Sequence, residues 1–429
     1  MEELDLPEPI KVKKNIKKQL DDLEQKGKNI YPFDGVPFIQ VLIYLYLIKK
    51  YKSKCIIHTK KEYFFNRHIG IGFPAKVTLD KTDKLELMEQ FKEVAQIVAK
   101  CINNGENTVI IPLTYSRGRG GHANMLIYKK KLNIIEHFEP HGSQYIDNPR
   151  LQQFITNYML EFVKLLNLEL HKFKIQPTTY VEASNVCPYI EGLQLIEGKS
   201  KLPSNKFESP GYCLAWSFFF TELCLKNLEL SSKDVLENIY NYLTTKPNTS
   251  NYLKQVIRGY SGYIAEIIDK YLEIFFKPKI SITELINSYK QFSPRNTTIN
   301  QTVQIISELE LKIMYDPEFN LKKELSKVKK EYKKQTKLLT KNGTKEEQRI
   351  AQFDYRNPEY RNLYLLKRVL QNYEEYNNTG RVSDPIFDSS EVISADKIVN
   401  LNVKTRKQKS SSTVKSHSKT KKTLIVDDE

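Results

Sequence analysis

The segment SPGYCLAWSFFFTELCLKN, residues 209–227, is apolar on nearly every side when it is drawn as a helix. A surface helix has one apolar stripe and one polar face, so a helix that is apolar all round must be enclosed by other elements. Ser209, Pro210 and Gly211 form a helix-start signal. The segment therefore predicts a helix in the middle of a domain, and Trp216 within it is expected to be a core residue.

Candidate strands and helices that can enclose this helix are found elsewhere in the chain. Short apolar runs predict strands at residues 108–115, 122–128, 133–139 and 171–180. Helical apolar spacing predicts helices at residues 84–102 and 149–170, and a buried helix is expected at residues 36–48, a run too short to span a membrane easily. This mixture of elements predicts an α+β domain.

Changes in composition divide the 429 residues into four parts. We expect a charged N-terminal arm at residues 1–30, as an exposed helix or a disordered segment, the α+β domain at 31–280, a charged helical extension at 281–378 and a basic tail at 379–429. The tail contains KTRKQKSSSTVKSHSKTKK, which has eight basic residues and no acidic one. Such a segment cannot bury enough apolar surface to order itself, so we expect disorder.

The net charge of +16 favours acidic partners. The basic tail and the Lys-rich helix at residues 320–348 can bind nucleic acid non-specifically through release of counterions from phosphates. A solvated charged face or a localisation signal explains the same charges equally well, and both interpretations stay open.

The cysteines favour a reducing compartment. The chain has five, an odd number without CxxC spacing: Cys55, Cys101, Cys187, Cys213 and Cys224. This pattern argues against a disulfide framework and against a structural zinc site. The N-terminal residues lack the apolar core of a secretory signal, so we expect a protein that is neither secreted nor bound to a membrane.

The segment GRGGHANMLIYKKKLNIIEHFEPHG, residues 118–142, has polar groups at the two ends of a strand pair. If the strands turn at Lys130-Lys131, His122 faces Glu139, and the β-carbons of directly opposed residues lie about 4.5 to 5.5 Å apart. A carboxylate at that distance can orient an imidazole. Lys-Lys is a poor sequence for a two-residue turn, so a slipped register is the alternative.

A histidine held by a carboxylate suits nucleophilic catalysis if a thiol lies nearby. Cys213 is the best candidate, because it lies in the first turn of the predicted buried helix, where unpaired N–H groups and the helix dipole favour a thiolate. Cys224 is on nearly the same stripe but near the C-terminal end of the helix, where the dipole opposes ionisation. We therefore expect Cys224 to be an unreactive core thiol.

These features together resemble the adenovirus-type and SUMO-protease-type cysteine peptidases, also called adenain-like and Ulp-like. The resemblance covers residues 107–227 and rests on Gly-Gly-His, two apolar strands, FEPHG at 138–142, and a later cysteine that opens an apolar helix. It implies a central mixed β-sheet packed with helices. It also implies that His122 is the base, that Glu139 orients it, that Cys213 is the nucleophile, and that Gln194 helps to stabilise the oxyanion. Gln194 precedes Cys213 by 19 residues, which implies an inserted loop if this assignment holds.

The function implied by the resemblance is thiol-dependent peptidase or isopeptidase activity through an acyl-enzyme, without a cofactor. The substrate would be a viral precursor protein or a ubiquitin-like conjugate, since a composition rich in Lys, Asn, Ile and Tyr indicates an AT-rich genome such as that of a large DNA virus. The host cytoplasm or the virion is the expected location. Two alternatives stay open: an acetyltransferase that uses the same triad with acetyl-coenzyme A, and a non-catalytic protein associated with virions or nucleic acid.

Two further patterns contain residue types that can form a binding site. His137, Glu139 and His141 alternate and are all zinc-ligand types, but they share a strand face only if the strand continues through Pro140, so we expect no metal. Arg117 and Arg119 can hold an acidic group of a substrate or nucleic acid, although a solvated loop is the simpler expectation.

Overall fold

A computed structural model describes most of the chain between residues 13 and 379. The described residues are 13–29, 37–51, 55, 70–74, 79–117, 120–143, 149–187, 189–204, 208, 212–276, 280–290, 294–315, 318–339 and 358–379. They form two compact units. The first unit comprises residues 1–273, 279–290 and 303–320, and the second comprises 274–278, 291–302 and 321–429.

The first unit is an α+β structure built on a mixed five-stranded sheet. Its strands, in spatial order, are β1 (Ile71–Pro74), β2 (Thr108–Arg117), β3 (Gly120–Lys129), β4 (Ile134–Phe138) and β5 (Thr179–Val181). β1 with β2 and β4 with β5 are parallel pairs, whereas β3 is antiparallel to both of its neighbours. The strands predicted at residues 108–115, 122–128 and 133–139 are present as β2, β3 and β4. The strand predicted at 171–180 is mostly wrong, because α4 continues to Lys172 and β5 begins only at Thr179. β1 is an additional strand that the sequence did not suggest.

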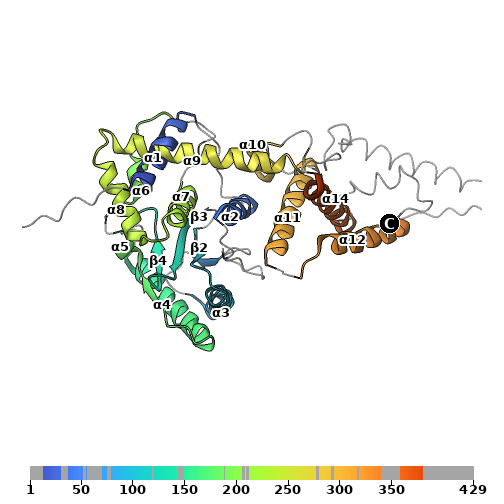
Figure 1. The fold of residues 1–429 in the computed structure, drawn as a ribbon, viewed down its shortest axis with the longest axis horizontal. Helices are drawn as coiled ribbons and strands as arrows, with labels where there is room; N and C mark the ends of the chain where they lie inside the picture. The colour runs from blue at the N-terminus through green and yellow to red at the C-terminus, as the bar shows by residue number, and fades with distance from the viewer. Residues whose placement is uncertain are drawn as a thin grey trace, which may run out of the picture. The chain divides into compact units, whose positions relative to one another are not determined.

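Helices cover both faces of this sheet (Figure 1). α3 (Lys81–Asn103) and α4 (Pro149–Lys172) pack on one face, where their apolar side chains form a common core with those of the strands. α7 (Cys213–Lys226) packs on the other face, and its Ser217 hydroxyl donates a hydrogen bond to the Ala123 carbonyl of β3. Every residue of α7 from Leu214 to Leu225 is buried, which confirms the predicted central helix.

The remaining described helices complete the two units. They are α1 (Lys14–Lys26), α2 (Pro37–Tyr51), α5 (Ala183–Val186), α6 (Leu193–Gly198), α8 (Ser232–Leu243), α9 (Thr249–Leu272), α10 (Ile282–Lys290), α11 (Pro294–Tyr315), α12 (Leu321–Leu339) and α14 (Pro358–Thr379). In the part of the chain that is described, none of the helices is both long and apolar enough to cross a bilayer.

The N-terminal helix is not the exposed arm that its charges suggested. α1 buries Ile16, Leu20 and Leu23, and it packs along α9. Gly259 of α9 lies so close to the backbone of Leu23 that a Cβ at this position would overlap it. A narrow apolar stripe in a highly charged helix was therefore enough to attach residues 14–26 to the first unit.

The β3–β4 connection corrects the predicted turn. Lys129 pairs with Ile134 instead of Leu132, so four residues, 130–133, form the loop. Asn133 has φ 51°, a left-handed conformation that asparagine tolerates better than most residues. The register is displaced by two residues, and an even displacement keeps every side chain on its predicted face.

The cysteine expectation is also wrong for one pair. Cys55 and Cys101 form a disulfide, with their sulfur atoms 2.02 Å apart and a sequence separation of 46. The Cys55 carbonyl accepts a hydrogen bond from Ile110 N–H, so β2 brings residue 55 next to the end of α3. Cys187, Cys213 and Cys224 remain free thiols.

In the second unit, α12 and α14 pack against each other through tyrosines. The rings of Tyr332 and Tyr360 stack with centroids 5.3 Å apart, and the Tyr360 hydroxyl lies 2.8 Å from Thr336 Oγ1. Residues 380–429, which hold the basic tail, lie outside the described residues.

Candidate active site

His122 and Glu139 form a close pair at the edge of the sheet where β3 begins and β4 ends. The distance from His122 Nε2 to Glu139 Oε1 is 2.6 Å. Glu139 is fully buried, and Oε1 also accepts a hydrogen bond from the His141 backbone N–H at 2.9 Å. The predicted pairing is present despite the displaced register, because Glu139 lies diagonally across from His122 on the same face. The imidazole is therefore held by a carboxylate that is itself fixed.

Cys213 joins this pair as the first residue of α7. Its sulfur accepts a hydrogen bond from Ala123 N–H at 3.5 Å and is hydrogen-bonded to the His122 ring. A thiol at a helix N-terminus also experiences the positive end of the helix dipole. Three residues that are far apart in the sequence thus form one cluster of thiol, imidazole and carboxylate.

The electrostatics of this cluster favour an ion pair between Cys213 and His122. Burial alone would raise the pKa of Cys213, but the hydrogen bond and the charge of His122 lower it below its ordinary value. Burial alone would likewise lower the pKa of His122, whereas the charge of Glu139 and the hydrogen bond to Cys213 raise it to about 10. A thiolate beside an imidazolium is the reactive form of a cysteine nucleophile.

Cys224 provides an internal comparison on the same helix. It is fully buried, and burial raises the pKa of its thiol. The nearby Lys129 ammonium opposes this shift without reversing its direction. Two thiols eleven residues apart on α7 therefore have pKa values displaced in opposite directions, as the sequence predicted.

Gln194 lies beside the turn that follows Glu139. Its backbone N–H donates to the Pro140 carbonyl at 3.0 Å, and the neighbouring Gly192 N–H donates to the His141 carbonyl at 2.6 Å. Within the described residues, Gln194 Oε1 is buried and has no hydrogen-bond partner. The start of α6 is therefore attached directly to the turn that carries Glu139.

Close contact between two glycines makes this attachment possible. Gly142 has φ 98°, and a Cβ there would overlap the backbone nitrogen of Gly192. Gly105 is a suitable control because it has φ 91° but nothing within 4 Å of its Cβ position. Gly142→Ala is expected to lower the free energy of unfolding by about 2 kcal/mol more than Gly105→Ala, since only Gly142 adds a backbone clash to the conformational strain. Urea denaturation measures both; equal losses would show that the contact between the glycines is unimportant.

A buried ionic network holds the residues that precede Cys213. Arg258 of α9 binds Glu208 in bidentate fashion, with Nε–Oε1 and Nη2–Oε2 distances of 2.9 Å. Tyr212, the N-cap of α7, donates its hydroxyl to Glu208 at 3.0 Å. Lys254, one turn before Arg258, bridges Glu208 at 3.0 Å and Glu197 of α6 at 2.6 Å. α9 thus positions both the entry to α7 and the helix that carries Gln194.

Removing one member of this network is expected to be costly. The Arg258 and Glu208 side chains are 5% and 4% exposed, so Arg258→Met leaves a buried carboxylate without its main partner. We expect a loss of about 3 kcal/mol in the free energy of unfolding. A double-mutant cycle with Glu208→Gln measures the coupling, and strictly additive losses would rule it out.

His137, Glu139 and His141, the alternative metal ligands, do not form one site among the described residues. His137 is buried; its Nδ1 contacts the Tyr180 hydroxyl at 2.9 Å and its Nε2 contacts Asn124 Oδ1 at 3.1 Å, and burial lowers its pKa to about 4. His122 takes its place, since atoms of His122, Glu139 and His141 that can ligate a metal lie within 4.8 Å of one another. Ligation would require a neutral His122, which its raised pKa opposes.

The sequence also singled out Trp216, Arg117 and Arg119. Trp216 is fully buried, as expected of a core residue. Arg117 ends β2, but its side chain and all of Arg119 lie outside the described residues. Two contributors to the site were not identified from sequence. They are the Ala123 N–H, which contacts the sulfur, and His141, whose ring stacks on that of His122 with centroids 4.2 Å apart.

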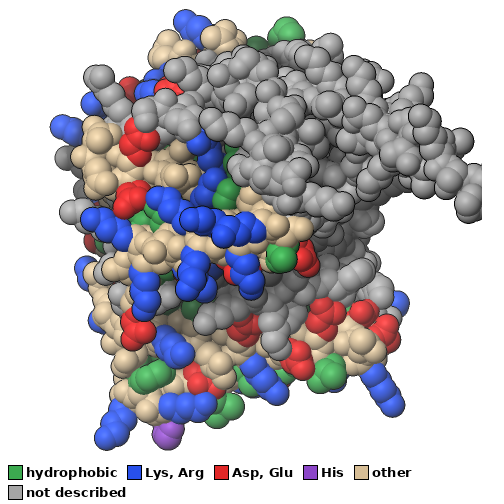
Figure 2. Space-filling view, turned by 90° about the vertical axis from the view of Figure 1, so that its right-hand side faces the viewer, with side chains coloured by type: hydrophobic (Ala, Val, Ile, Leu, Met, Phe, Trp, Pro, Cys, Tyr) green, Lys and Arg blue, Asp and Glu red, His purple; other side chains and the backbone are tan. Residues whose placement is uncertain are grey.

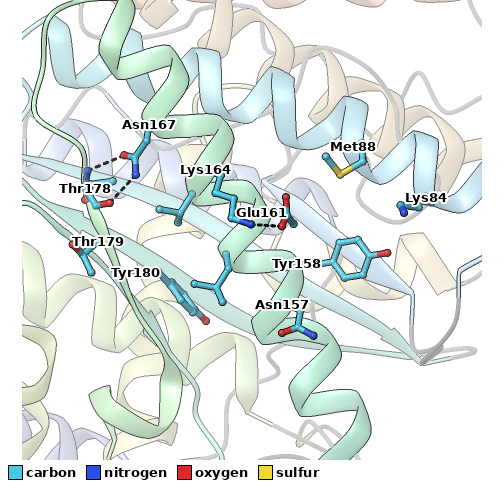
Figure 3. A pocket seen from close by; sticks show the side chains of 12 residues that line it. Lys84, Met88, Asn157, Tyr158, Glu161, Lys164, Asn167, Thr178, Thr179 and Tyr180 are labelled. Carbon is cyan, nitrogen blue, oxygen red and sulfur yellow. Dashed lines mark hydrogen bonds and ion pairs between the residues drawn. The ribbon is translucent and has the colours of Figure 1, made fainter.

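A cavity of about 810 Å³ lies elsewhere in the first unit, between α3, α4 and β5 (Figure 3). Lys84 and Met88 from α3, Tyr158 and Glu161 from α4, and Tyr180 from β5 point toward it. None of His122, Glu139, Gln194 and Cys213 lines this cavity. This cavity is therefore separate from the candidate active site.

No protein-family model matches the chain. It is 24% identical over 314 residues to the putative ankyrin repeat protein L371 of Acanthamoeba polyphaga mimivirus, a match that covers 69% of this chain and 38% of that protein. The chain thus spans about two fifths of this relative's length. Among solved structures, the Chlamydia trachomatis effector protein ChlaDUB1 is similar at a TM-score of 0.31 and 10% identity, over 62% of this chain and 96% of that one.

Proposed function

We propose that the protein is an adenain-like or Ulp-like cysteine peptidase that cleaves peptide or isopeptide bonds through an acyl-enzyme. The observation that carries this proposal is the cluster of Cys213, His122 and Glu139 at the N-terminus of a central helix. The thiol is hydrogen-bonded to an imidazole that is in turn held at 2.6 Å by a buried carboxylate. This is the arrangement that nucleophile, base and orienting acid need for acyl transfer.

The chemistry follows from the ion pair. The Cys213 thiolate attacks the substrate carbonyl, and the tetrahedral intermediate collapses when His122 gives its proton to the leaving amine. Water, deprotonated by His122, then hydrolyses the thioester and regenerates the thiol. The backbone N–H of Cys213 and the side chain of Gln194 are proposed to stabilise the oxyanion in both steps. No cofactor takes part in this scheme.

The proposed substrate is a ubiquitin-like conjugate or a viral precursor protein, with the host cytoplasm or the virion as its location. Similarity to a mimivirus protein supports a viral source. For a ubiquitin-like substrate, the C-terminal glycine carbonyl is the electrophile. Cys213 is only partly exposed, and we propose that its substrate presents a narrow, extended C-terminal tail, as ubiquitin-like proteins do.

The test uses the full chain with ubiquitin and SUMO that carry a C-terminal propargylamide electrophile. A covalent adduct on Cys213, located by peptide mass spectrometry, together with cleavage of the corresponding C-terminal amides, is the expected result. In parallel, labelled acetyl-coenzyme A tests the acetyltransferase alternative. Acetyl transfer to protein without any cleavage would overturn the peptidase proposal, and failure of every electrophile to modify Cys213 would favour a non-catalytic role.

A further inference from the structure

The lysines of α12 form a basic face in the second unit. Eight lysines lie between Lys322 and Lys337, against two glutamates, and all eight are exposed. Figure 2 shows Lys and Arg side chains gathered on the face of the molecule that it draws. α12 therefore carries a net charge of +6, eight lysines less two glutamates.

The neighbouring helix α14 adds positive charge to this face. Lys367 lies 3.8 Å from the centre of the Tyr332 ring and 5.3 Å from that of Tyr364. The pKa of Lys367 is lowered to about 8; burial is the main cause of this shift, and the neighbouring positive charges of Arg368 and Lys329 add to it.

We propose that the exposed face of α12, together with Lys367 and Arg368, binds the phosphate backbone of nucleic acid without sequence preference. A helix of 19 residues is about 28 Å long and displays a lysine on the same stripe at each turn. A polyanion with phosphates repeated along its length matches this array, and binding releases one set of counterions for each phosphate that is neutralised. The inference is independent of the peptidase proposal.

A membrane surface fits this helix less well. An interfacial helix inserts its apolar face between lipids. The apolar stripe of α12 is already used, because Leu325 and Val328 are 2% and 5% exposed. Leu338 at the C-terminal end is 72% exposed, and one leucine does not make an apolar face. The observations therefore favour nucleic acid over lipid.

The experiment compares three full-length proteins. The test variant carries Lys→Gln at Lys323, Lys327, Lys330 and Lys334, which share one exposed stripe of α12. The control variant carries Lys→Gln at Lys92, Lys100, Lys164 and Lys172, which are exposed on α3 and α4. Both lose the same net charge, and both retain the basic tail. Circular dichroism confirms that each is folded.

Fluorescence anisotropy measures binding to a labelled 20-base-pair DNA duplex and to single-stranded RNA between about 50 and 200 mM salt. We expect the test variant to bind about 100-fold more weakly at the lowest salt concentration. Its slope of log affinity against log salt should be smaller by about 3 to 4, and the control should stay close to the wild type. Comparison of the two affinities shows whether the protein prefers the phosphates of a duplex or those of a single strand.

Two outcomes would overturn the proposal. In one, the test variant binds both nucleic acids with the affinity and salt slope of the control, which would place binding outside α12. In the other, the wild type binds vesicles of phosphatidylserine and phosphatidylcholine but neither nucleic acid.

Discussion

His122→Ala is expected to lower kcat/KM for cleavage of a ubiquitin-like C-terminal amide by about 10³-fold or more. Without the imidazole, Cys213 loses the partner that lowers its pKa, and the leaving amine loses its proton donor. Both effects act on the same step, so the loss should appear mainly in kcat. Single-turnover kinetics with the purified variant measure it.

The matched control for this variant is His171→Ala, because His171 is exposed in the last turn of α4. That change should leave cleavage unaffected. Added imidazole should restore part of the activity of His122→Ala, since a diffusible base can occupy the space of the missing ring. Cleavage by His122→Ala at the wild-type rate would eliminate the proposed base.

Glu139→Gln is expected to lower kcat/KM by about 10²-fold and to narrow its pH profile. The substitution keeps the shape of the side chain and removes the negative charge that raises the pKa of His122 to about 10. The active ion pair exists above the pKa of Cys213 and below that of His122. Loss of the carboxylate lowers the pKa of His122, so the alkaline limb of the profile should move to lower pH.

Glu136→Gln distinguishes this effect from general damage to the core. Glu136 is also a buried carboxylate of β4, where both oxygens accept from Ser232 N–H at 2.9 Å and Lys129 lies 3.9 Å away. Glu136→Gln should lower the free energy of unfolding. The alkaline limb of its pH profile should stay where it is in the wild type. An alkaline limb that is the same in Glu139→Gln and in the wild type would show that Glu139 does not act on His122.

Local sequence was sufficient to predict the elements around the site. The apolar segment at 209–227 could only be a buried helix, and the polar ends of residues 118–142 predicted that His122 and Glu139 would meet. The predicted turn was two residues too short: Lys-Lys is a poor sequence for a two-residue turn, but it does not indicate which longer loop replaces it. The pairing survived because a displacement of two residues preserves the face of each side chain.

Contacts between distant segments were not predictable in this way. The disulfide joins Cys55 to Cys101 because a hydrogen bond to Ile110 of β2 holds residue 55 near the end of α3, and no spacing motif signals it. Arg258 and Lys254 support the entry to α7 from a helix that starts 36 residues after Cys213. In the sequence, Arg258 and Lys254 are ordinary charged residues of an amphipathic helix. They become part of the site only because α9 packs against α6 and α7.

The most direct test of the central claim is the rate at which iodoacetamide alkylates each free thiol as a function of pH. If the thiol of residue 213 is paired with the ring of residue 122, it should react fastest of the three free cysteines near neutral pH. The pH at which its alkylation rate is half-maximal should lie below the ordinary pKa range of a thiol. In His122→Ala this pH should rise. A half-maximal pH in the ordinary range that His122→Ala leaves unchanged would contradict the account.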